Sequence, residues 1–168
     1  MSPIQVAFDV TDQQLLNKFY TDILPSAVDS VDPKMKPAWG EMSPQHMIEH
    51  LLFAFQISTG KLKVECHTPE HKREKLRTFL ERNIPMPKGF TNPVTGDSLP
   101  ALQFENLAQS QELLHSEIEH FLQFYENHPN AVHTNPMFGE LGSDLWKKFH
   151  FKHCFHHLEQ FKVIQEAK

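Results

Sequence analysis

Apolar residues recur at helical spacing in four separated stretches of this chain, and this periodicity restricts the fold more than any other feature. In the clearest stretch, Leu107, Leu114, Ile118, Phe121 and Tyr125 form one stripe. The sequence shows no convincing strand alternation and no internal repeat. The pattern therefore predicts an all-α fold, a four-helix bundle in which each apolar stripe faces a shared core.

Local start and stop signals delimit the first two predicted helices. Thr11 or Asp12 can cap the first helix, and Pro25 is expected to kink or interrupt it. Ser43 followed by proline is a strong start for the second helix, because serine is a good N-cap and proline suits the first helical position. Gly60 is a suitable residue for its C-terminal end.

The last helix is predicted to begin near Ser143 or Asp144 and to run almost to Lys168. Between the second and third helices we expect an extra short helix within residues 69–82, rich in charge and mostly solvated. It is followed by a proline- and glycine-rich loop over residues 83–100. Long loops of this kind are often binding elements or lids.

Length and charge limit the class of protein. A chain of 168 residues, 39% hydrophobic and 22% charged, predicts a single globular domain spanning residues 1–168. The net charge of −5 and the lack of a basic tract argue against a nucleic-acid partner and against binding to an anionic membrane. No apolar run approaches the roughly 20 residues needed to span a bilayer, and the N-terminus lacks the pattern of a secretory signal. The isolated cysteines Cys66 and Cys154 predict a reduced, cytoplasmic protein.

Four of the chain's twelve histidines fall within the stretch HFKHCFHHLEQF, which begins at His150. At about 100° of rotation per helical residue, His153 and His157 lie on the face that also carries Trp146. These two imidazoles are therefore predicted to point into the core. His150 and His156 border that face and are expected to pack beside it.

The second predicted helix repeats the spacing with His46 and His50. His50 shares a face with Met47 and Ala54, so it is predicted to point inward. His46 lies in the first turn, where the site could have a polar entrance, and it is our candidate for proton transfer there.

Two histidines one helical turn apart can reach the same metal ion, because their Cβ atoms are only about 6 Å apart. A third ligand must come from another helix, and His50 is the best placed, which gives a predicted metal site of His50, His153 and His157. Three neutral imidazoles with an open fourth position are typical of catalytic zinc. Nickel would also accept these ligands, as would iron or manganese. Gln160 is a candidate for orienting a ligand or a substrate.

A second apolar strip, Phe151, Phe155 and Leu158, lies on the opposite side of the last helix. One bundle core cannot absorb both sides. The strip is therefore expected to pack on the middle segment or to form a subunit interface.

These motifs together resemble the DinB/YfiT-like superfamily of metal-dependent proteins. SPQHMIEHL is similar to the motif of its second helix, and HCFHHLEQF is similar to the motif of its last helix. NPMFGELGSDLW and the PMPKGF loop are similar to one subgroup of uncertain function. The resemblance covers roughly residues 40–161, and the chain departs from the commonest pattern in residues 61–104.

The resemblance implies a four-helix bundle with the up-down-down-up connection of the family and a triad of His50, His153 and His157. It also implies a homodimer, and in some relatives the use of a low-molecular-weight thiol. We therefore predict a metal-dependent protein that acts on a small molecule as a hydrolase or a thiol-dependent transferase. The alternatives are a non-catalytic metal-binding or sensing protein, and a structural bundle whose core histidines are simply hydrogen-bonded.

Overall fold

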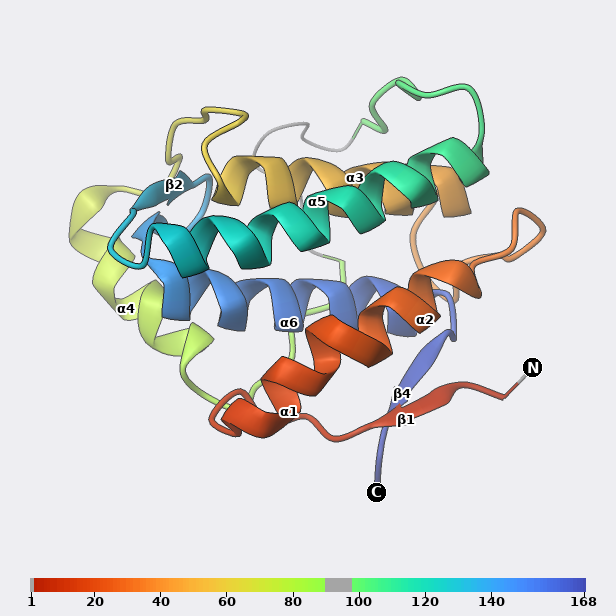
Figure 1. The fold of residues 1–168 in the computed structure, drawn as a ribbon, viewed down its shortest axis with the longest axis horizontal. Coiled ribbons are helices and arrows are strands. Elements are labelled where there is room, and N and C mark those ends of the chain that lie inside the picture. The colour runs from red at the N-terminus through yellow and green to blue at the C-terminus, as the bar shows by residue number, and fades with distance from the viewer. Residues whose placement is uncertain (1, 90–97) are drawn as a thin grey trace.

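Three long helices form the centre of the molecule: α3 (Pro44–Ser58), α5 (Leu107–Asn127) and α6 (Ser143–Gln160). This computed structural model describes residues 2–89 and 98–168. Helix α5 lies beside α3 (Figure 1), and α6 packs against α3 and meets α5 where the rings of His150 and Phe121 lie 4.8 Å apart. None of the helices within these two ranges combines the length and the apolar character needed to cross a membrane.

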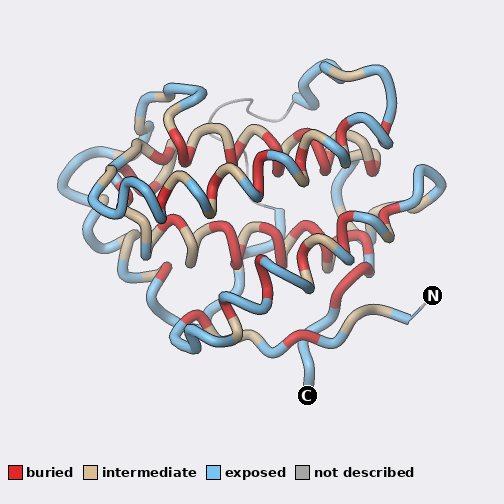
Figure 2. The backbone as a smooth tube through the Cα atoms, in the orientation of Figure 1, coloured by how far each residue is buried: buried red, intermediate tan, exposed pale blue. Residues whose placement is uncertain are grey.

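The stripe predicted for α5 is confirmed, because Leu107, Leu114, Ile118, Phe121 and Tyr125 are all buried. Burial follows the inner faces of the helices, while the outer faces and loops are exposed (Figure 2). The Tyr125 hydroxyl donates a hydrogen bond of 2.6 Å to the carbonyl oxygen of Ser58 and so ties α5 to the end of α3.

The N-terminal helix departs from α geometry just before Pro25, where a kink or interruption was predicted. It is divided into α1 (Gln13–Lys18), the π-helical turn η1 (Phe19–Ile23) and α2 (Leu24–Asp29). Asp12 caps α1, since its side chain accepts from the backbone N–H of the third helical residue. Pro25 has no N–H to donate and its ring crowds the preceding turn, so the wider π turn before it accommodates the proline.

The predicted all-α four-helix bundle with an up-down-down-up connection is wrong. The described residues form a mixed, mainly helical fold with two small sheets. Strands β1 (Ile4–Val6) and β4 (Ile164–Glu166) pair in parallel, and β2 (His133–Asn135) and β3 (Gly139–Leu141) form an antiparallel hairpin. Each strand has only three residues, which is too short for alternation to be visible in the sequence.

Helix α6 ends at Gln160, whereas it was predicted to run almost to Lys168. Lys162 follows in the left-handed conformation, with φ of 57°. The N–H of Val163 donates to the carbonyl oxygen of Leu158 at 2.8 Å, and that of Lys162 donates to Glu159 at 2.9 Å. This is a Schellman termination with lysine at the position usually held by glycine, so no glycine marks the end of the helix in the sequence.

The apolar strip Phe151, Phe155 and Leu158 is buried inside the chain itself. Phe8 packs against Phe155 with ring centroids 5.0 Å apart, and Phe19 packs against Phe151 at 4.8 Å. The expectation that the middle segment or a second subunit covers this strip is therefore wrong, because the N-terminal segment covers it. Homodimerisation stays a prediction, without support from this strip.

The predicted short, charged helix is confirmed as α4 (Glu70–Leu80), of which Leu80 is the buried residue. Part of the long loop predicted after it, residues 90–97, lies outside the described residues. Between residue 98 and α5, the chain is held by Glu49 on α3. Its buried carboxylate accepts from the backbone N–H of Gln103 at 2.8 Å and from that of Phe104 at 3.2 Å. Glu49 thus fixes the segment that leads into α5.

A buried ammonium joins α4 to α6. Lys152 on α6 is fully buried, and its Nζ donates to the carbonyl oxygens of Phe79, Arg82 and Ile84 at 2.6, 2.6 and 2.7 Å. The same Nζ lies 3.9 Å from the ring centroid of Phe79. Burial lowers the pKa of Lys152 to about 8, so the ammonium remains the main form at neutral pH. The contact ties the last turn of α4 and the segment after it to α6.

We expect Lys152→Met to destabilise the protein by about 3 kcal/mol or more, because it removes three hydrogen bonds donated by a buried ammonium. Denaturant unfolding at pH 7 would measure the loss. The matched control is Lys148→Met, which removes only a pair with the exposed Asp144 at 2.9 Å and should cost at most about 1 kcal/mol. Equal costs for the two variants would contradict a structural role for the buried ammonium.

Candidate metal centre

Three imidazoles from two helices converge beneath the surface. His50 comes from α3, and His153 and His157 come from successive turns of α6. The Nε2 atoms of His50 and His153 lie 2.8 Å apart, and the ring of His157 lies 4.7 Å from His50 and 4.8 Å from His153, centroid to centroid. One ligand nitrogen from each of the three lies within 4.8 Å of the others. The three histidines are therefore close enough to bind one metal ion.

Helix packing explains this convergence. His153 and His157 share a face because they are one turn apart. His50 is brought opposite them where α3 packs on α6, at a contact in which the rings of Phe55 and His150 stack 3.9 Å apart. His150 is fully buried, and neither of its nitrogens has a hydrogen-bond partner among the described residues, so it acts as a packing residue.

The three histidines are neutral at physiological pH. Burial, followed by the nearby His156, lowers the pKa of His50 to about 4. Burial is also the main cause that holds the pKa values of His153 and His157 well below the ordinary value of 6.5, and the neighbouring histidines add to it. Neutral imidazoles keep a lone pair for coordination. Among the residues that the structure describes, no carboxylate or thiol joins this group.

Gln160 fixes the orientation of His157. Its Nε2 donates to the carbonyl oxygen of Trp39 at 2.8 Å, so its Oε1 is the atom that faces His157 Nδ1 at 2.9 Å. That oxygen can only accept, hence Nδ1 must carry the proton and Nε2 must carry the lone pair. Gly40 allows this approach: it has φ of +75°, and a Cβ there would lie 3.0 Å from Gln160 Nε2.

Gln160→Leu should lower metal affinity by about 10–100-fold, because His157 loses the acceptor that selects its tautomer. Competition with a chromogenic chelator would measure the change. The matched control is Gln111→Leu, since the Gln111 amide also donates to carbonyls, those of Val28 and Val31, but far from the histidines. If both variants bind metal as the unmodified protein does, Gln160 does not position His157.

The donor set fits a divalent ion. At a tetrahedral zinc ion with Zn–N distances of about 2.0–2.1 Å, the ligand nitrogens lie about 3.4 Å apart. The His50 and His153 Nε2 atoms, now 2.8 Å apart, need to separate only slightly to reach that spacing. In the described part of the chain, His153 Nδ1 is buried with no hydrogen-bond partner, so Nε2 is its engaged nitrogen.

A cavity of about 500 Å³ adjoins the three histidines, which form part of its wall together with His156. Most of the remaining wall is apolar and comes from α3, α4, α6 and the β2–β3 turn. His50 and His153 keep some accessible surface because they face this cavity. The arrangement leaves one side of the histidine group open to a small molecule.

The two residues predicted to act in catalysis lie in different places. Gln160 contacts His157, one of the three clustered histidines. His46 instead faces Ser43, whose Oγ lies 2.7 Å from His46 Nδ1 and whose backbone N–H donates to the same nitrogen at 3.4 Å. These contacts form a capping box at the start of α3, and His46 is not part of the cavity wall. Proton transfer by His46 stays a prediction.

Several residues of the site were not predicted. Trp39 lies in a linker, yet its carbonyl anchors Gln160 and its ring lies 5.5 Å from the ring of His156. Lys88 extends over the Trp39 ring at 4.3 Å. Leu76 of α4 lines the cavity although that helix is mostly exposed. Such contacts join segments that are distant in sequence, and only the glycine after Trp39 hinted at a close approach.

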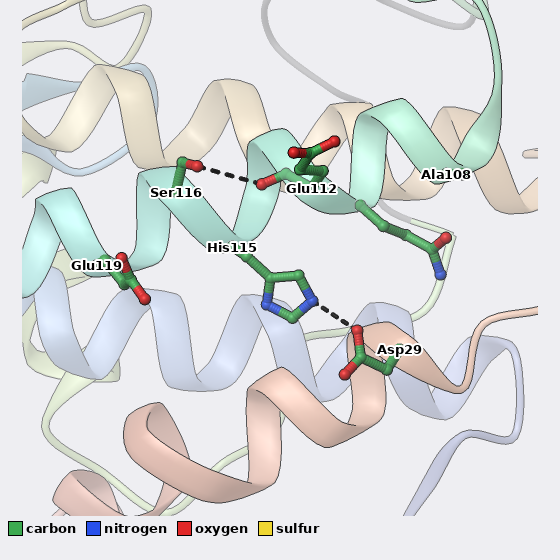
Figure 3. A pocket seen from close by; sticks show the side chains of 7 residues that line it. Asp29, Ala108, Glu112, His115, Ser116 and Glu119 are labelled. Atoms are coloured by element: carbon green, nitrogen blue, oxygen red, sulfur yellow. Dashed lines mark hydrogen bonds and ion pairs between the residues drawn. The ribbon is translucent and has the colours of Figure 1, made fainter.

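A second, shallower pocket of about 360 Å³ lies between α2 and α5 (Figure 3). In it His115 Nε2 lies 2.7 Å from Asp29 Oδ1, and the carboxylates of Glu112 and Glu119 lie nearby. The Asp29 side chain is 71% exposed. An exposed pair of this kind contributes little to stability, and we assign the pocket no function.

No family model, curated protein or solved structure matches this chain. The resemblance to the DinB/YfiT-like superfamily therefore stays a prediction, and the case for a metal centre rests on its own geometry.

Proposed function

We propose that this protein is a metal-dependent enzyme that acts on a small molecule, as a hydrolase or as a thiol-dependent transferase. His50, His153 and His157 hold a divalent ion, zinc or nickel in the first place, with iron or manganese as alternatives. The observation that carries the proposal is the convergence of three neutral imidazoles at the wall of a cavity of about 500 Å³.

The open side of the histidine group favours catalysis over a purely structural site. Structural zinc sites are usually closed by four protein ligands, whereas catalytic sites have three and leave a position for water or substrate. Bound here, the ion supplies Lewis-acid chemistry, either polarising a carbonyl or lowering the pKa of a coordinated water or thiol. Three neutral ligands leave the full positive charge of the ion available for that purpose.

The remaining residues hold and shield this centre. Gln160 keeps His157 in the correct tautomer, and the packed rings of Phe149 and His153, 5.0 Å apart, restrict the movement of His153. The apolar wall limits access of bulk water. A low-molecular-weight thiol as co-substrate and a homodimer are proposals drawn from the superfamily resemblance. We also propose a cytoplasmic location, because Cys66 and Cys154 are both free.

The proposal is tested with untagged protein, stripped of metal and reloaded separately with zinc, nickel, iron or manganese. Esters, amides and thiol acceptors form the substrate panel. We expect turnover with at least one metal and none for His153→Ala under the same loading. Bound metal without turnover on the panel would favour the sensing alternative, and no bound metal would favour a structural role.

A further inference from the structure

We propose that the cavity beside the histidines binds the apolar body of the substrate, while a polar head of the same molecule meets the metal. The ligand class is a small molecule with one metal-coordinating group, such as a carboxylate or hydroxamate, on a single alkyl or aryl body. This inference rests on the proposed function, because the metal supplies the anchor for the head.

The histidines and the apolar residues of the cavity wall lie at different positions along α3 and α6. On α6, Trp146 and Phe149 line the cavity before His153 in the chain, and on α3 Ile57 lines it after His50. Because the helices rise about 1.5 Å per residue, Trp146 and Ile57 each lie about 10 Å along the axis from the nearest ligand on their own helix.

The two apolar positions belong to the same end of the cavity, since α3 and α6 run antiparallel. The end of α3 and the start of α6 both meet β2 at His133. A Cβ on Gly60, just after α3, would lie 2.5 Å from the His133 ring, and Trp146 Nε1 donates to the His133 carbonyl oxygen at 3.2 Å. The histidines therefore lie toward one end of the cavity, where Met42 and Met86 also form part of the wall, and the other end is lined mainly by carbon-rich side chains.

The apolar end offers little polar surface. Leu76 and Phe79 of α4 and Met137 of the β2–β3 turn form its wall. The amide-bearing residue there, Asn135, is only 2% exposed, and its Oδ1 accepts from the backbone N–H groups of Met137 and Phe138 at 2.9 and 3.1 Å. The Nδ2 of Asn135 is buried and has no hydrogen-bond partner among the described residues, so this wall offers at most that one donor. A charged or strongly hydrated body would therefore lose its water and gain almost no partners here.

The size of the cavity sets the scale of the ligand. About 500 Å³ lies within the range of roughly 300–1,000 Å³ that is typical of small-molecule sites. The aromatic and methionine side chains around it suit flexible alkyl chains and flat rings alike. The chemistry of the wall thus selects the body of the ligand, and the histidine end selects its head.

A series of straight-chain hydroxamates, from acetohydroxamate to octanohydroxamate, tests the inference by calorimetry on the full chain, both loaded with zinc and metal-free. We expect affinity for the zinc-loaded protein to rise about fourfold for each added methylene until the cavity is filled. The metal-free protein should bind the series more weakly but with a similar increment. Affinity that does not change with chain length in either form would overturn the inference. If the protein nevertheless binds zinc tightly, the proposed function stands.

Ile57→Asn places an amide at the apolar end and should remove most of the length dependence while zinc affinity stays unchanged. Met137→Asn tests the same end should Ile57→Asn fail to fold. Leu62→Asn is the control, because Leu62 is 41% exposed and does not line the cavity. An unchanged length dependence in the cavity variants would overturn the inference. Failure of the unmodified protein to bind zinc would instead count against the proposed function. The length dependence measured on the metal-free protein would still show whether the cavity binds an apolar body.

Discussion

His153→Ala is expected to lower the affinity for zinc by well over a hundredfold. The variant removes a nitrogen that lies 2.8 Å from His50 Nε2, at the centre of the ligand group. Loss of a direct ligand should lower affinity by more than the roughly 10–100-fold that is typical of losing a residue hydrogen-bonded to a ligand. His50→Ala and His157→Ala should behave alike, since the three residues share one site. Elemental analysis of untagged protein, followed by calorimetric titration of zinc, measures the effect.

His115→Ala is the matched control for these variants. His115 also sits on a helix and has a polar partner, but it pairs with exposed Asp29 rather than with the histidine group. We expect it to bind zinc as the unmodified protein does. Retention of stoichiometric zinc in His153→Ala, or its loss in His115→Ala, would contradict the assigned site.

In the metal-free protein, stability should fall steeply as the pH drops below about 6.5. The folded-state pKa of His50 is lowered to about 4, mainly by burial, while in the unfolded chain it returns to about 6.5. Between these values the unfolded state binds more protons, so the free energy of unfolding increases with pH. The penalty is absent above pH 6.5, grows as the pH falls, and for His50 alone reaches about 3 kcal/mol near pH 4. His150, His153 and His157 shift in the same direction and add to the slope.

Urea unfolding with chelator present, at half-unit steps from pH 7.5 to 4.5, measures this dependence. The interval above pH 5 is the informative one, because ordinary carboxylates titrate below it. His150→Phe should make the slope shallower, since that residue is buried and its pKa is lowered by burial. Stability that does not vary between pH 6.5 and 5 would mean that the buried histidines are not neutral in the folded state.

The grouping of His50, His153 and His157 could be predicted because its signal is local. The spacing of His153 and His157 places them on one face of any helix, and the apolar neighbours of His50 turn it inward. Helix α3 was predictable for the same reason, since Ser43 and Pro44 mark its start within the chain itself. The structure brings the residues chosen in this way into one group.

The features that sequence reasoning missed depend on contacts between distant segments. The β1–β4 pair forms only when both ends of the chain meet, and the end of α6 depends on Lys162 adopting a conformation that favours glycine. Phe8 could not be recognised as the cover of the Phe151 strip, because nothing near it in the sequence marks that role. Gln160 was a candidate by position, but its acceptor role became clear only from its contact with Trp39.

X-ray diffraction from zinc-loaded crystals, recorded at the zinc absorption edge, tests the metal centre most directly. We predict one strong anomalous peak about 2.0–2.1 Å from the Nε2 atoms of His50, His153 and His157, on the side that faces the cavity. Absence of a peak among these three nitrogens, with protein that is saturated with zinc, would contradict the assignment.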